Sequence, residues 1–166
     1  DTMSNIASAF SNFAKMPAQQ NETLNLVNIV KLALDIFNED YLHFICDEEE
    51  IVVKLDRTQL IRVITNLVKN AIQAMNSVKS PRILVTVASE ADKVKISVAD
   101  NGIGIADDVK EKIFEPKFTT KTSGMGLGLG MVKSIVENYN GTISFTSQVG
   151  KGTVFSVKFP KASKTI

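Results

Sequence analysis

Apolar residues recur along this chain with two spacings, one typical of helices and one typical of strands. Steps of three and four residues between apolar positions predict helices over 3–15, 25–37, 57–77 and 126–138. Alternation of apolar and polar residues predicts strands over 41–46, 51–55, 82–89, 94–100, 142–147 and 153–159, of which the third and fourth form a hairpin. A short helix is expected near 107–114.

Capping residues support these boundaries. Asn25 and Asp56 precede the second and third helices as N-caps, and Gln59 completes a capping box with Asp56. Pro17 ends the first helix, and an Asn-Gly pair closes the last. We therefore expect a helical segment over 1–16, a linker over 17–24, one domain over 25–160 and a tail over 161–166.

The mixture of helices and hairpin-forming strands predicts an α+β fold. Its form is a two-layer α/β sandwich, with one mixed or antiparallel sheet and the helices on a single face. A length of 166 residues, with 44% apolar and 22% charged residues, fits one globular domain with a short appendage.

Charge and cysteine content narrow the possible partners. A net charge of +1 gives no reason to expect a nucleic-acid surface. Cys46 is the only cysteine, which excludes an intrachain disulfide and suits a reducing compartment. No apolar run approaches the ~20 residues that cross a bilayer, and no signal peptide is visible. We expect a cytoplasmic location, and membrane anchoring of a longer parent chain stays open.

Four motifs follow one another between residues 66 and 153. The segment Asn66–Asn70 comes first, and three glycine clusters follow at Asp100–Gly104, Gly124–Gly130 and Gly150–Thr153. Each alone is typical of a turn or a helix cap. Together, in this order, they indicate a nucleotide site built from one helix and several loops.

The residue types fit that chemistry. Asn66 and Asn70 lie one turn apart on one helix face, and a carboxamide oxygen is a ligand that suits Mg²⁺. Asp100 ends a strand, where its carboxylate can accept a hydrogen bond from an exocyclic amine. The alternatives are a solvated helix face and an ordinary Asp-Asn-Gly turn. The acidic run 47–50 is expected to be a solvated loop rather than a metal site.

The second glycine cluster lies where a loop becomes a helix, so backbone N–H groups and the helix dipole can bind phosphate there. Four glycines cost a helix about 1 kcal/mol each, which suggests that close backbone approach is needed. No Gly-Lys-Ser/Thr follows, so the cluster is not a P-loop, and no apolar strand leads directly into it, as a Rossmann loop requires.

The four motifs resemble the N, G1, G2 and G3 boxes of the GHKL superfamily, which comprises gyrase, heat-shock chaperone, histidine kinase and mismatch-repair ATPases. The segment Ile113–Lys121 is similar to the F box of histidine kinases. Residues Phe10–Pro17 resemble the end of the second dimerisation helix in sensor kinases of the nitrogen-regulation (NtrB/NtrY) type. The resemblance implies a Bergerat-type fold with a mobile ATP lid over 105–125, and the catalytic ATP-binding domain of a two-component sensor histidine kinase.

The resemblance also implies a role for each site residue, with ATP and Mg²⁺ as cofactors. Asn70 would ligate the metal and Asn66 would bond near the phosphates, while Asp100 reads the adenine amino group. Thr153 would support the same base edge through water, or is an ordinary strand residue. The nucleotide would further contact Gly102, Gly104, Gly124, Gly126, Leu127 and Gly128.

In the implied lid, Phe114 and Phe118 would be anchors. Catalytic contacts to the γ-phosphoryl group would come from Asn66, Asn70, Thr119, Thr120 and Lys121. Lys117 is either a phosphate-sensing cation or a solvated lysine.

Asn66 separates kinase from hydrolase, because hydrolysing members of the superfamily carry a glutamate there that activates water. His43 is the only histidine and lacks the context of a phosphoacceptor, so we expect it to be structural or exposed. The implied partners are the dimerisation and phosphoacceptor helices of a homodimeric parent kinase and the receiver domain of a response regulator. Two alternatives remain: a nucleotide-gated regulatory module, and an ATP-hydrolysing chaperone or topoisomerase domain.

Overall fold

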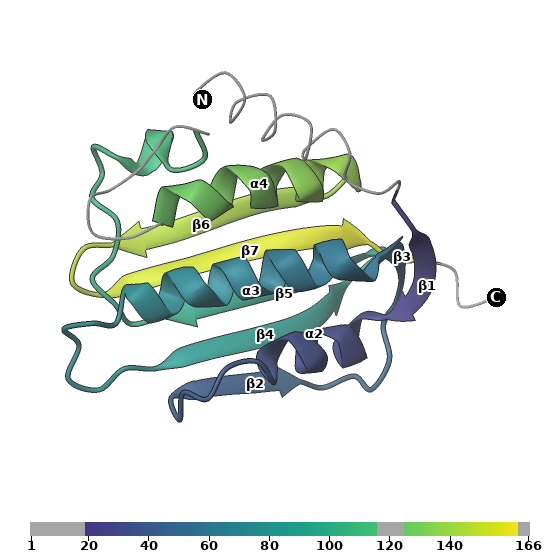
Figure 1. Cartoon of the computed structure of the whole chain (residues 1–166), viewed down its shortest axis with the longest axis horizontal. Coiled ribbons are helices and arrows are strands. Elements are labelled where there is room, and N and C mark those ends of the chain that lie inside the picture. The colour runs from purple at the N-terminus through teal and green to yellow at the C-terminus, as the bar shows by residue number, and fades with distance from the viewer. Residues whose placement is uncertain (1–18, 116–124, 163–166) are drawn as a thin grey trace, which may run out of the picture.

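The computed structural model describes residues 19–115 and 125–162, with the backbone alone over 125–127. A five-stranded sheet has the order β2-β4-β5-β7-β6 (Figure 1). Its strands are β2 (Leu42–Cys46), β4 (Ile83–Glu90), β5 (Lys93–Asp100), β6 (Thr142–Gln148) and β7 (Gly152–Pro160). Strand β2 runs parallel to β4 and the other neighbours are antiparallel, so the sheet is mixed.

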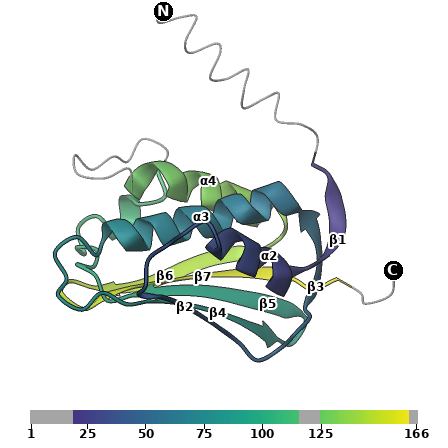
Figure 2. The same ribbon diagram turned by 60° about the horizontal axis from the view of Figure 1, so that its bottom comes forward.

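Three helices cover one face of this sheet, as Figure 2 shows from a second direction. They are α2 (Leu26–Leu34), α3 (Arg57–Gln73) and α4 (Met125–Asn138). Alternate strand residues such as Val85, Ile96 and Val157 are fully buried beneath them. The predicted two-layer α+β sandwich is confirmed. None of the helices in the described residues combines the length and apolar character needed to span a bilayer.

A second, two-stranded sheet was not predicted. Strand β1 (Asn21–Asn25) pairs antiparallel with β3 (Val52–Asp56), so the linker expected over 17–24 is wrong for residues 21–24. Leu24 lies opposite Val53 in this pair, and both are buried. The other residues of β1 are polar and mostly exposed, so its sequence shows no alternation of apolar residues.

Two helices end earlier than predicted. Helix α2 ends at Leu34 rather than residue 37, and α3 ends at Gln73 rather than residue 77. Beyond both ends the chain continues in turns with i→i−3 bonds, such as Phe37 N–H to Leu34 O (3.1 Å) and Met75 N–H to Ile72 O (3.0 Å). These turns keep the apolar spacing of a helix, which is why the sequence pattern predicts helices that are too long.

Both predicted N-caps are confirmed. The Asn25 side chain accepts from Val27 N–H (3.1 Å), and Asp56 accepts from the amides of Thr58 (2.8 Å) and Gln59 (3.3 Å). The reciprocal half of the capping box is not formed, because Asp56 N–H donates to the Tyr139 hydroxyl (3.1 Å).

Two smaller predictions need correction. The helix expected near 107–114 is only a 3-10 turn, η1 (Lys110–Lys112). The predicted tail begins later than residue 161, because Lys161 N–H donates to Asp92 O and Ala162 N–H donates to Val52 O, both at 2.8 Å. Residues 1–16, expected to be helical, lie outside the described residues.

Candidate functional site

Three polar side chains form a row across three neighbouring strands at one end of the sheet. Thr153 of β7 is the register partner of Asp100 on β5 and of Ser147 on β6. Directly opposed residues point to the same face of a sheet, so the three side chains lie side by side. Thr153 is only 5% exposed, which marks this end of the sheet as a partly buried polar site.

Asp100 is the ionisable member of this row. Burial raises the pKa of its carboxyl group above the ordinary range, and hydrogen bonds from the amides of Gly102 and Thr153 partly offset that rise. The Gly102 amide donates to the carboxylate at 2.9 Å. A carboxylate that is partly desolvated and keeps free lone pairs is a strong acceptor for a ligand N–H.

The predicted glycines next to Asp100 are required by close contacts between loops. A Cβ on Gly102 would lie 2.6 Å from the carbonyl oxygen of Ala74, at the end of α3. Gly104 has a φ of +78° and packs on the backbone of Gln148, and Gly150 N–H donates to Ile103 O (2.9 Å). The first and third glycine clusters therefore pack against each other and against α3.

Asn70 is buried in α3, with 7% of its surface exposed. Its Nδ2 has no hydrogen-bond partner within the described residues, which is unusual for a buried amide. Ala74 lies one turn further along α3 and contacts Gly102, so Asn70 lies at the same end of the molecule as the Asp100 loop. A buried amide without a partner is suited to binding a ligand.

The structure brings Asn66 against the second glycine cluster. A Cβ on Gly128 would lie 3.1 Å from both Cγ and Oδ1 of Asn66. The first turns of α4 thus cross α3 at this asparagine, and glycine permits the close approach. Gly126 and Leu127 also lie in the first turn of α4, where only the backbone is described.

Outside the described residues are Lys117, Phe118, Thr119, Thr120, Lys121 and Gly124. Phe114, the other predicted anchor, packs edge-on against Phe145 with ring centroids 5.8 Å apart, and the Lys133 ammonium lies 5.5 Å from the centre of its ring.

His43 is exposed on β2, as expected of a surface residue. The Asn101 side chain binds the segment that leads into β4, accepting from Arg82 N–H (2.7 Å) and donating to Ser80 O (2.8 Å). These contacts assign it a structural role.

Sequence reasoning missed Ser147, whose hydroxyl lies 2.7 Å from the Thr153 Oγ1. Nothing in its local sequence marks it, because serine in a strand is common. Aligning the two last strands as a hairpin would have placed it opposite Thr153.

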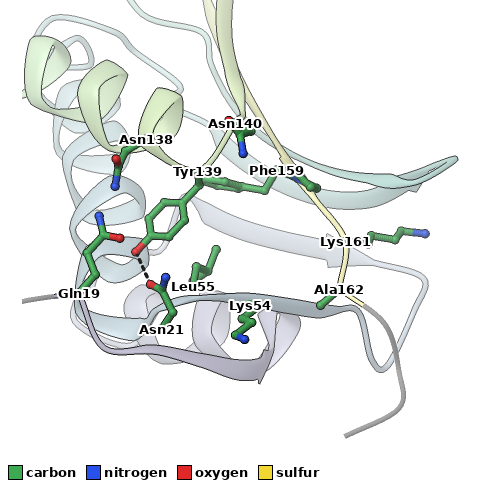
Figure 3. Close-up of a pocket in the computed structure, with 11 residues that line it drawn as sticks. Gln19, Asn21, Lys54, Leu55, Asn138, Tyr139, Asn140, Phe159, Lys161 and Ala162 are labelled. Carbon is green, nitrogen blue, oxygen red and sulfur yellow. Dashed lines mark hydrogen bonds between the residues drawn. The ribbon is translucent and has the colours of Figure 1, made fainter.

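Two cavities lie at opposite ends of β7. A cavity of about 300 Å³ adjoins the polar row and is lined by Asp100, Ser147, Thr153 and their neighbours. A larger one of about 510 Å³ lies at the other end, where the Tyr139 hydroxyl donates to Asn21 Oδ1 at 3.0 Å (Figure 3). None of the predicted site residues lines the larger cavity, so its size does not make it the functional site.

Comparisons with known proteins identify the family of the chain. Residues 55–163 match the family described as histidine kinase-, DNA gyrase B- and HSP90-like ATPase. Sensor histidine kinase ZraS of Escherichia coli K12 is 35% identical over 166 residues, covering 96% of this chain and 35% of ZraS. A putative NtrY-like sensor histidine kinase of Rickettsia conorii is 33% identical, covering 93% of this chain and 26% of that protein. The chain thus spans about a third or less of these relatives.

Solved structures match over the whole domain. The catalytic domain of histidine kinase ThkA has a TM-score of 0.76 at 35% identity, covering 86% of this chain and 96% of that chain. ThkA in complex with response regulator protein TrrA has a TM-score of 0.76 at 29% identity, covering 99% of this chain and 49% of that chain. The chain therefore belongs to the histidine kinase-, DNA gyrase B- and HSP90-like ATPase family, as the catalytic ATP-binding domain of a sensor histidine kinase.

Proposed function

We propose that this domain binds Mg·ATP and passes the γ-phosphoryl group to a histidine outside these residues, from which an aspartate of a response regulator receives it. The observation that carries the proposal is the unpartnered, buried amide of Asn70 at the same end of the molecule as the partly desolvated Asp100. A neutral oxygen ligand and a base-reading carboxylate are the two ends of a nucleotide site.

The polar row would hold the base. The Asp100 carboxylate accepts from the exocyclic amino group of adenine, and its partial burial strengthens that bond. Thr153 supports the same edge through a bridging water, since it lies directly opposite Asp100. Gly102 and Gly104 shape the loop that closes over the base by fixing it to α3 and to β6.

The α3–α4 crossing would hold the phosphates and the metal. The Asn70 carboxamide would hold Mg²⁺ through its oxygen, which a turn of the amide brings to the position of the unpartnered Nδ2, and Asn66 would bond beside the phosphates. Backbone N–H groups around Gly124, Gly126, Leu127 and Gly128 bind phosphate oxygens at the start of α4. Bound Mg²⁺ supplies neutralisation of phosphate charge.

Thr119, Thr120 and Lys121 complete the proposed catalytic set at the γ-phosphoryl group, together with Asn66 and Asn70. No carboxylate occupies position 66, and an amide takes up no proton at neutral pH. Water is therefore not activated there, and the phosphoryl group remains available to a better nucleophile. This absence favours transfer over hydrolysis.

The domain would act within a longer, homodimeric parent kinase. We assign residues 1–16 to the end of a dimerisation helix, 21–162 to the catalytic domain and a cytoplasmic location to both. The NtrY-like relative supports a nitrogen-regulation subtype, and the structure of ThkA with TrrA supports a response regulator as the downstream partner.

A transfer assay tests this proposal. The chain is mixed with labelled Mg·ATP and a separately produced dimerisation and phosphoacceptor region from a related sensor kinase. We expect acid-labile, base-stable label on the acceptor, and none with an acceptor whose histidine is replaced by glutamine. ATP binding without transfer to several such acceptors would contradict the kinase assignment and favour a nucleotide-gated regulatory module.

A further inference from the structure

We propose that Ser147 is a positioning residue for nucleotide recognition: it fixes the hydroxyl proton of Thr153 and ties the base edge to the segment that follows Gly104. The inference rests on the proposed ATP site. It starts from the row of Asp100, Thr153 and Ser147, in which Ser147 is the member farthest from the proposed base contact.

The Ser147 hydroxyl makes three contacts. It accepts from Ile105 N–H at 2.7 Å, lies 2.7 Å from Thr153 Oγ1, and lies 3.1 Å from Gly152 O. A hydroxyl has one proton and two lone pairs, so the direction of each bond can be counted. All three contacts are hydrogen bonds only if Ser147 donates to Gly152 O and the Thr153 hydroxyl donates to Ser147.

The opposite direction is worse. If Ser147 donated to Thr153, its oxygen would face the Gly152 carbonyl oxygen at 3.1 Å with no proton between them. The favoured direction commits the Thr153 proton away from the base, so that Thr153 presents lone pairs beside the Asp100 carboxylate. This edge then offers two acceptors and favours ligand groups that donate, either an amine or a water that donates to the ring.

The same residue also contacts the segment that follows Gly104. Ser147 O accepts from Lys110 Nζ at 2.7 Å, and Lys110 forms an ion pair with Asp107 at 2.8 Å. Together with the bond from Ile105 N–H, these contacts hold the backbone of residues 105–110 against the end of β6. Ser147 therefore couples base recognition to the chain that leads toward residue 115.

The test compares Ser147→Ala with Ser144→Ala. Ser144 lies on the same strand but on the opposite, exposed face, and it makes no side-chain hydrogen bond in the described part of the chain. We expect Ser147→Ala to weaken ATP binding roughly five- to thirtyfold, from the loss of one or two hydrogen bonds. We expect Ser144→Ala to bind ATP like the wild type, and Ser147→Thr to recover most of the affinity.

Base preference gives a readout that a general loss of structure would not move. Inosine triphosphate replaces the exocyclic amine with an acceptor, so the wild type should bind it much more weakly than ATP. In Ser147→Ala the Thr153 hydroxyl proton is free to turn toward the base. The ratio of ATP affinity to inosine triphosphate affinity should therefore fall. Thr153→Val should lower this ratio similarly. The double variant should bind ATP no more weakly than the weaker-binding single variant, because both substitutions act through the Thr153 hydroxyl.

Amide exchange adds a structural readout. The Ile105 amide should exchange faster in Ser147→Ala than in the wild type, and at the wild-type rate in Ser144→Ala. Unchanged ATP affinity and base preference in a folded Ser147→Ala would overturn the role of Ser147 and leave the ATP site standing. A wild type that binds no ATP would instead overturn the site. If Ser147→Ala does not fold, Ser147→Cys decides the matter, because it keeps the size of the side chain and replaces the hydroxyl with a weak donor and acceptor. An unchanged base preference in folded Ser147→Cys would again overturn the role of Ser147.

Discussion

The negative charge of Asp100 lowers the stability of the nucleotide-free domain. Its pKa is raised by burial, so the folded chain holds this proton more tightly than the unfolded chain does. The free energy of unfolding therefore falls as pH rises from the ordinary carboxyl pKa through the raised one. Below that window the carboxyl group is neutral in both states and costs nothing. We interpret this cost as the consequence of holding a strong acceptor where the base binds.

Without nucleotide at pH 7, Asp100→Asn should have a free energy of unfolding equal to or above that of the wild type, since it removes the buried charge and keeps an acceptor for Gly102 N–H. The difference should shrink as the pH is lowered toward 4. Urea denaturation at several pH values measures it. A variant that is less stable than the wild type at pH 7 and gains relative stability in acid would contradict the sign of the pKa shift.

Asn70 leads to a second residue-scale prediction. Asn70→Ala removes an amide whose Nδ2 bonds to nothing in the described residues, so the fold should lose little stability. Phosphotransfer and the Mg²⁺ dependence of ATP binding should both be lost. Asn28→Ala is the matched control, because Asn28 is an exposed amide on α2. Transfer by Asn70→Ala at the wild-type rate with Mg²⁺ would exclude Asn70 as the metal ligand.

At the scale of elements, the Tyr139 hydroxyl connects β1, β3 and α3. It donates to Asn21 Oδ1 of β1 and accepts from Asp56 N–H, where β3 ends and α3 begins, while the ring packs edge-on against Phe159 at 6.4 Å. Burial also raises the pKa of this hydroxyl, which keeps it protonated and able to donate. The β1–β3 pair is thus attached to the main layers from the end of α4.

Replacing Tyr139 with Phe should therefore cost about 1–3 kcal/mol of unfolding free energy, because Asp56 N–H loses its partner and Asn21 loses a donor. Amides of β1 should exchange faster, and ATP affinity should hardly change, because the site lies at the other end of β7. Tyr41→Phe is a control whose hydroxyl makes no hydrogen bond among the described residues. Equal stabilities of the two Phe variants would show that the Tyr139 hydroxyl bonds contribute nothing.

The third glycine cluster offers a matched pair of loop glycines. Both have positive φ, +81° at Gly150 and +122° at Gly152. A Cβ on Gly150 would meet nothing within 4 Å, whereas one on Gly152 would collide with the carbonyl oxygen of Asp100. Gly150→Ala should cost about 1–2 kcal/mol from backbone strain alone, and Gly152→Ala clearly more. Thermal and urea unfolding compare the two, and similar costs would mean that the backbone at Asp100 moves easily to make room for a Cβ.

At the scale of the whole molecule, sequence reasoning reached the features that local chemistry marks. The spacing of apolar residues located α2, α3, α4 and the strands of the five-stranded sheet. The residue types of Asn25 and Asp56 identified them as N-caps. Features that depend on residues distant in sequence were missed. Strand β1 has one buried apolar residue and is a strand only because β3 pairs with it. Ser147 lies beside the candidate site residue Thr153 only through the register of β6 with β7.

The same limit applies to the site. Asp100, Asn66, Asn70 and the glycines could be named from their motifs, because each residue type has a chemical reason to be there. Sequence alone could not show that Gly102 and Gly104 serve loop packing in this structure, nor that Asn70 is buried without a partner for its Nδ2 among the described residues. Both facts follow from the crossing of α3 with the loop after β5, which only the folded chain defines.

Calorimetric titration of Mg·ATP into the chain and into Asp100→Asn tests the central claim most directly. The wild type should bind one ATP per chain, with much weaker binding of inosine triphosphate. Asp100→Asn should remain folded, judged by its circular dichroism, and lose measurable ATP binding, because an amide can turn its N–H₂ toward the base amine. Wild-type affinity for ATP in folded Asp100→Asn would contradict the assignment of this end of the sheet as the nucleotide site.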